Sequence, residues 1–234
     1  MRKVFLFVAV LALITSSLAQ SRPGAIGPSA VWQFPASFLS AAHAACDQSG
    51  DQRKVGDCFM NQMAKAGAPA DAVSFTRRLY RQSRGEFGIM SRFNKVGPAD
   101  IAWVTYPLRA NPKYGLLLVN GQPGIVNAED LKLLDQKGME QSFQYQDVRN
   151  QFPKVGLWPG DRDGTTWPNS QSGPNGGVQF VLGYPLRNGC QTCANAGSAL
   201  FTWNFDAAGK FTGTTFMGLT PAPLTPAGSG SPQQ

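Results

Sequence analysis

The sequence contains a single histidine, His43, and none of the short motifs that most often carry catalysis. It has no Gly-x-Ser-x-Gly nucleophile turn, no glycine-rich phosphate loop and no His-Glu-x-x-His zinc motif. A lone histidine in a hydrophobic helix is most often packed or capped, and one histidine leaves few routes to a Ser-His-Asp triad. The alternative is that His43, three residues before Cys46 on the same helical face, binds a metal or activates a thiol. We expect neither a metal site nor a cofactor.

Long apolar runs are also scarce. The one at residues 4–14 is well short of the roughly 20 residues that span a bilayer. Basic residues precede this run, and small residues follow at Ser17 and Ala19, where a signal peptidase cleaves. We therefore predict that residues 1–19 are a cleaved signal peptide and that no membrane span remains. The protein is expected in the periplasm or outside the cell.

Cysteine is sparse but even in number, with Cys46, Cys58, Cys190 and Cys193. An even set in an exported chain predicts two disulfides, and four cysteines allow three pairings. Pairing of near neighbours, Cys46 with Cys58 and Cys190 with Cys193, is the simplest. The first two cysteines are too far apart in sequence to form the second close pair of a zinc site.

The segment Cys190-Gln191-Thr192-Cys193 has the spacing of a redox-active dithiol. Such a pair needs a helix N-terminus to lower the pKa of one thiol, whereas a strand pattern begins here at Ala199. We interpret the pair as a structural clasp of a loop. The alternative function is a thiol-disulfide oxidoreductase that uses Cys190 and Cys193.

Residues 34–84 have the apolar spacing of helices, with expected helices over 34–48, 53–65 and 70–83. A disulfide between Cys46 and Cys58 would hold the first two as a helical hairpin. The third carries the only concentration of basic residues, Arg77, Arg78, Arg81 and Arg84. We interpret this run as a solvated helix face; the alternative is a patch for anionic lipid, polysaccharide or nucleic acid. Because the other basic residues are scattered, we expect no nucleic-acid partner.

Residues 86–219 change to the alternation of β-strands. Asn120-Gly121, between two apolar runs, is a strong hairpin signal, and Asn127 is a candidate cap for a helix that continues, broken near Gly138, to about residue 150. Residues 159–177 are expected to be a long polar loop. The expected strands lie at 87–93, 101–106, 114–119, 122–126, 178–184, 199–205 and 211–219.

A four-residue sequence occurs twice in this half: Tyr106-Pro107-Leu108-Arg109 is repeated as Tyr184-Pro185-Leu186-Arg187. Each copy is expected to end a strand, which suggests two repeated β units and about six antiparallel strands. A pseudo-twofold axis could then bring Arg109 and Arg187 together as an anion clamp beside Tyr106 and Tyr184. The alternative is that Tyr-Pro only ends two strands and that both arginines are solvated.

The sequence as a whole predicts one α+β domain over residues 20–220, in which an N-terminal helical hairpin and a third helix pack on a mainly antiparallel sheet. Residues 221–234 are expected to be disordered. The expected role is a non-enzymatic exported protein that binds an unknown protein or anionic ligand. A hydrolase built on two carboxylates is a further alternative, with candidates at Glu86, Asp100, Glu129, Asp130, Glu140 and Asp147.

Overall fold

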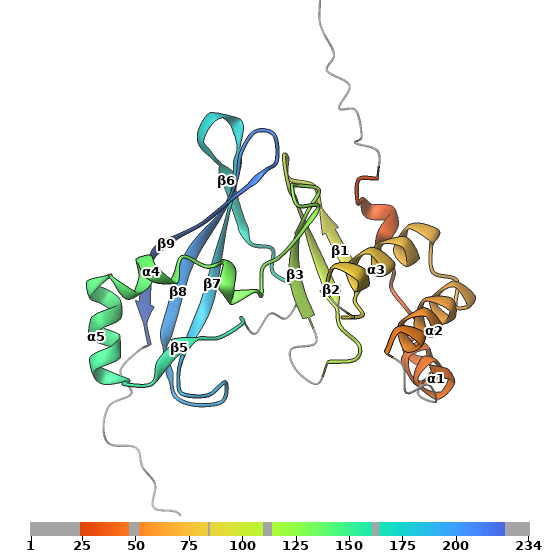
Figure 1. Ribbon diagram of the computed structural model, residues 1–234, viewed down its shortest axis with the longest axis horizontal. Helices are drawn as coiled ribbons and strands as arrows, with labels where there is room; N and C mark the ends of the chain where they lie inside the picture. The colour runs from red at the N-terminus through yellow and green to blue at the C-terminus, as the bar shows by residue number, and fades with distance from the viewer. Residues whose placement is uncertain (1–23, 47–51, 84, 110–113, 161–163, 223–234) are drawn as a thin grey trace, which may run out of the picture.

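A computed structural model describes residues 24–46, 52–83, 85–109, 114–160 and 164–222. Three N-terminal helices pack on antiparallel sheets, so the predicted α+β class is confirmed. Figure 1 shows the order across the molecule: the N-terminal helices, a first sheet, a second sheet, and a pair of short helices beside the second sheet. The predicted signal peptide and the last twelve positions, residues 223–234, lie outside the described residues.

The helical layer consists of α1 (Ala36–Cys46), α2 (Gln52–Lys65) and α3 (Ala70–Gln82). A disulfide between Cys46 and Cys58 joins the end of α1 to α2, which confirms the predicted helical hairpin. Buried Phe38, Phe59 and Met63 fill the space between these helices and the first sheet. Burial of these large apolar side chains provides the main stabilisation of the layer.

The first sheet has the strand order β1-β2-β3-β4, with every neighbouring pair antiparallel. Its strands are β1 (Ile89–Asn94), β2 (Asp100–Thr105), β3 (Tyr114–Val119) and β4 (Ile125–Asn127). In β2, Ala102 and Val104 pack toward α3, while Ile101 and Trp103 pack toward the second sheet. Both faces of this sheet are therefore buried.

The second sheet has the order β5-β7-β8-β9, with β6 paired to β7 beside this path. Its strands are β5 (Val155–Leu157), β6 (Asn169–Ser172), β7 (Val178–Asn188), β8 (Asn195–Phe205) and β9 (Phe211–Pro221). The described strands thus form two sheets of four and five strands, rather than one sheet of about six. The predicted polar loop at 159–177 contains β6, whose exposed Asn-Ser-Gln-Ser sequence carries no apolar alternation and pairs through its backbone.

A common core joins the two sheets. Trp103 and Leu118 of the first sheet are buried in the same cluster as Phe180, Phe201 and Trp203 of the second. The β3–β4 turn also bonds to the second sheet, because the backbone of Gln122 exchanges hydrogen bonds with Gly209 and Phe211. The two sheets therefore form one structural unit.

The predicted helix after Asn127 is instead three short pieces, η2 (Leu131–Leu133), α4 (Gln136–Glu140) and α5 (Phe143–Gln151). Each piece has its own N-cap side chain, Asp130, Asp135 or Ser142, that accepts a backbone N–H hydrogen bond. Local caps of this kind start a new helix at each site instead of extending the previous one. Both α4 and α5 pack against the edge strand β9.

The hairpin of β3 and β4, which the Asn-Gly pair predicted, is confirmed. Asn120 in its turn holds the segment at Ile26 against this hairpin. Its backbone is left-handed (φ 66°), and its side-chain amide bonds to both the N–H and the carbonyl of Ile26. The same amide donates to the buried carboxylate of Asp100 at 2.7 Å, and Asp100 also accepts from the N–H groups of Val96 and Gly97. Two loops and the segment at Ile26 are thereby fixed by one polar network.

We predict that Asn120→Gly lowers the free energy of unfolding by about 1–3 kcal/mol. Glycine keeps the left-handed backbone but removes the hydrogen bonds to Ile26 and Asp100. The control is Asn175→Gly, an exposed residue with a similar backbone (φ 53°), which should be neutral. Urea unfolding of both variants measures the effect, and equal losses would contradict the proposed importance of the network.

Candidate functional site

The two Tyr-Pro-Leu-Arg segments lie in different local structures. The first follows β2 as a turn closed by the bond from Arg109 N–H to the Tyr106 carbonyl, whereas the second lies inside β7. The prediction that Tyr184-Pro185 ends a strand is wrong. The Pro185 carbonyl accepts a hydrogen bond from Trp158 N–H and therefore points away from β8. The ring nitrogen of Pro185 points the same way, so the missing N–H removes no hydrogen bond to β8. This difference gives no support to a duplication.

Arg109 is already paired with two carboxylates. Its guanidinium lies 2.7 Å from oxygens of both Glu86 and Glu129, and it stacks 3.6 Å from the centre of the Tyr106 ring. Burial by itself would lower the pKa of Arg109, but the hydrogen bonds to Glu129 and Glu86 outweigh it and raise this pKa overall. The pairing favours a structural role for Arg109 over the capture of an anion.

The tyrosines of the two segments differ in their hydroxyl groups. The Tyr184 hydroxyl donates to the Ala128 carbonyl at 2.6 Å, while the buried Tyr106 hydroxyl has no hydrogen-bond partner among the described residues. Burial raises the pKa of Tyr106 well above its ordinary value, with Arg109 opposing the shift. Because Glu129 follows Ala128 in the chain, both segments contact the same turn between the sheets.

The candidate carboxylates do not gather into one site. Only Glu86 and Glu129 converge, and the guanidinium of Arg109 lies between them. Asp100 accepts from Asn120, Asp130 caps η2, Glu140 is exposed on α4, and Asp147 lines a cavity on α5. The pair of candidates that the described contacts bring together is therefore closed by an arginine and lacks the open geometry of a hydrolase.

The predicted disulfides are both formed, in the local pairing. Cys190 and Cys193 lie in the short turn between β7 and β8, so neither thiol has the helix N-terminus that a redox pair uses. His43 packs edge-on against Phe59, with ring centres 5.4 Å apart. Throughout the described segments, no three His, Cys, Asp or Glu side chains lie together as a metal site would require.

The basic run on α3 is partly used within the fold. Arg78 donates to the Gly24 carbonyl, while Arg77 and Arg81 are exposed. Arg84 lies outside the described residues. This arrangement is that of a solvated helix face with one internal anchor.

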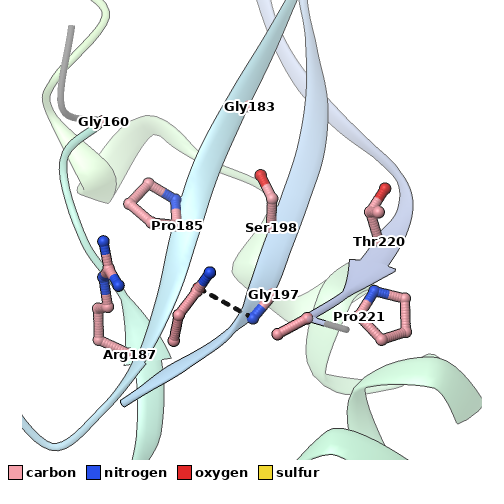
Figure 2. A pocket seen from close by; sticks show the side chains of 10 residues that line it. Gly160, Gly183, Pro185, Arg187, Gly197, Ser198, Thr220 and Pro221 are labelled. Carbon is pink, nitrogen blue, oxygen red and sulfur yellow. Dashed lines mark hydrogen bonds between the residues drawn. The ribbon is translucent and has the colours of Figure 1, made fainter. Parts of the chain in front are cut away.

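Arg187 lies in a cavity of about 430 Å³ on the side of the second sheet that faces away from the common core. Figure 2 shows its guanidinium beside Pro185, with the hydroxyls of Ser198 and Thr220 on the neighbouring strands β8 and β9. The complete lining is Gly160, Gly183, Pro185, Arg187, Asn195, Gly197, Ser198, Thr220, Pro221 and Ala222. Three adjacent strands therefore supply one cation and two hydroxyls to the same space.

The guanidinium of Arg187 has no ion pair and no hydrogen bond to any residue in the described parts of the chain. Ser198 donates to the Tyr184 carbonyl at 3.3 Å, so its oxygen can still accept. Glycine keeps the cavity open: a Cβ on Gly197 (φ 133°) would lie 2.5 Å from the Thr220 carbonyl oxygen, and one on Gly183 would lie 3.3 Å from the Ser198 oxygen. The site can accept an anion without displacing an internal partner.

The sequence singled out Arg187 but not the residues around it. Ser198 and Thr220 pair with each other across β8 and β9, and Ser198 pairs with Pro185 across β7 and β8. These neighbours depend on the register of the sheet, which a single sequence does not specify. The one sign of the cavity in the sequence is that two small residues, Gly197 and Ser198, interrupt the apolar residues of this strand.

Comparisons with protein-family models, curated proteins and solved structures found no match for this chain. A search of the described helices for one long and apolar enough to span a bilayer found none.

We predict opposite effects of removing the two tyrosine hydroxyls. Tyr184→Phe should lower the free energy of unfolding by about 1–3 kcal/mol, because it leaves the Ala128 carbonyl without this donor. Tyr106→Phe should be neutral or stabilise by about 1 kcal/mol, because it removes a buried hydroxyl without a described partner. Thermal and urea unfolding measure both, and a loss in Tyr106→Phe equal to that in Tyr184→Phe would contradict the assignment.

The raised pKa of Tyr106 also predicts a pH dependence of stability. The pKa of Tyr106 is raised in the folded state above its ordinary value of 10.0, so above pH 10 the unfolded chain loses this proton before the folded protein does, and a rise in pH up to the folded-state pKa favours unfolding. The free energy of unfolding should therefore fall more steeply above pH 10 in the wild type than in Tyr106→Phe. Parallel curves would show that Tyr106 is not the titrating group.

We further predict that the Cys190–Cys193 disulfide has a reduction potential below about −300 mV, as structural disulfides have. The flanking strands hold the two cysteines together, because Asn188 N–H bonds to the Ala194 carbonyl across the turn. Alkylation and mass spectrometry in defined thiol buffers measure the potential, with Cys46–Cys58 as the internal comparison. A value between about −120 and −270 mV, with one fast-reacting thiol, would instead indicate an oxidoreductase.

Proposed function

We propose that this chain is an exported, non-enzymatic binding protein and that its Arg187 cavity binds an anionic group of a ligand or protein partner. The observation that carries the proposal is the guanidinium of Arg187, which lines a cavity of about 430 Å³ and has no partner among the described residues. Arg109, with the same preceding three residues, has two carboxylate partners. Arg187 therefore differs in having an uncompensated charge among the described residues.

The chemistry of the lining fits a carboxylate, phosphate or sulfate group. A guanidinium presents two parallel N–H donors to two oxygens of such an anion, and charge-assisted bonds of this kind are stronger than neutral ones. The hydroxyl of Thr220 lies on the same wall and can supply a further donor. The volume is within the range of small-molecule sites.

Export is part of the proposal, and two observations support it. The N-terminal sequence has the basic, apolar and small-residue regions of a signal peptide. Both disulfides are formed in the fold, which is consistent with an oxidising compartment. No described feature favours the thiol-disulfide or hydrolase alternatives.

The test is a titration of the mature protein with phosphate, sulfate and acetate, followed by NMR chemical shifts and calorimetry. Arg187→Gln should weaken binding by about 10-fold or more, because it removes a charge-assisted bond worth about 1.5–3 kcal/mol. Arg187→Lys should retain part of the affinity, since it keeps the charge but loses the planar pair of donors.

The matched control is Arg77→Gln, an exposed arginine on α3. It changes the net charge equally and should leave the affinity unchanged. Equal weakening by both variants would indicate a general electrostatic effect, and unchanged binding in Arg187→Gln would contradict the proposed site.

A further inference from the structure

A second and larger cavity, of about 810 Å³, adjoins the Arg187 cavity. It lies between α5 and the ends of β8 and β9, and the two cavities share Asn195, Pro221 and Ala222 as lining residues. Its full lining is Gln144, Asp147, Val148, Gln151, Phe152, Ala194, Asn195, Ala196, Pro221 and Ala222. The shared residues form the boundary between the two spaces, so one extended ligand could contact both.

The helical side of the larger cavity has the opposite charge. Asp147 is the single charged residue in its lining, and its carboxylate has no hydrogen bond or ion pair with any residue in the described segments. Asp147 and Gln151 lie one turn apart on α5, so both face the same space. The neighbouring Val148 and Phe152 provide apolar surface. This lining suits a cationic group attached to a partly apolar body.

Gln144 is less available than the other polar residues. Its side-chain oxygen already accepts from the Leu219 N–H at 3.1 Å, which ties α5 to β9. That bond fixes the wall that carries Asp147 relative to the strand ends that border the Arg187 cavity. Arg187 and Asp147 therefore lie on parts of the fold that are fixed relative to each other.

From this arrangement we infer that the ligand is a short peptide with a free amino end and a free carboxyl end. Its carboxylate binds Arg187, its ammonium group binds Asp147, and its backbone crosses the boundary at Asn195 and Pro221. The inference rests on the proposed function and specifies its ligand class. A simple anion would use only Arg187 and would leave the larger cavity without a role.

The test uses alanine peptides of about three to six residues, a series that covers end-to-end lengths of roughly 10–20 Å. Each peptide is compared in three forms: both ends free, N-acetylated, and C-terminally amidated. In the wild type, the form with both ends free should bind about two- to fivefold more tightly than the acetylated form at the best length, as expected for an ion pair with the exposed Asp147. The amidated form should bind most weakly.

Asp147→Asn, which keeps the shape of the side chain, should remove this preference for a free amine without weakening the acetylated form. Arg187→Gln should weaken both carboxylate-bearing forms. Glu140→Gln, an exposed carboxylate on the adjacent α4, is the matched control and should change nothing.

The outcomes separate the two proposals. If Arg187 is needed but a free amine gives no gain at any length, the peptide inference fails while anion binding stands. If neither the peptides nor small anions depend on Arg187, the proposed function fails as well.

Discussion

The double burial of the first sheet is the constraint on which the rest of the fold depends. Along β2, Ala102 and Val104 contact the helical layer while Ile101 and Trp103 contact the second sheet, so alternate residues of one strand serve two cores. A shift of the register by one residue would exchange these sets and place the indole of Trp103 against α3. The polar network of Asp100 and Asn120 at the end of the same strand opposes such a shift.

Much of the fold could be predicted from the sequence because its signals are local. Helical spacing gave three helices, the Asn-Gly pair gave the β3–β4 hairpin, and even cysteine number gave two disulfides. The division into two sheets could not be predicted, because it depends on contacts between residues far apart in the chain, such as Trp103 and Trp203. The polar strand β6 was missed because it has no apolar alternation and is defined by its pairing with β7.

The candidate site shows the same limit. The repeated Tyr-Pro-Leu-Arg sequence indicated Arg187 as a candidate. The two identical tetrapeptides nevertheless have arginines in different surroundings: Arg109 lies between Glu86 and Glu129, and Arg187 lines a cavity. The difference comes from partners distant in sequence. The expected anion clamp of Arg109 with Arg187 has no support in this geometry, since Arg109 is already paired. Ser198 and Thr220 could be assigned only once the strand register was known.

The short turn between β7 and β8 has a consequence for the kinetics of the proposed binding. Arg187 and Asn195 are paired across this ladder, and a disulfide closes the turn that joins them. Walls built on paired strands need little rearrangement to receive a ligand, so association would be limited mainly by diffusion and orientation. Differences in affinity among ligands of the proposed site would then appear mainly in how long each remains bound.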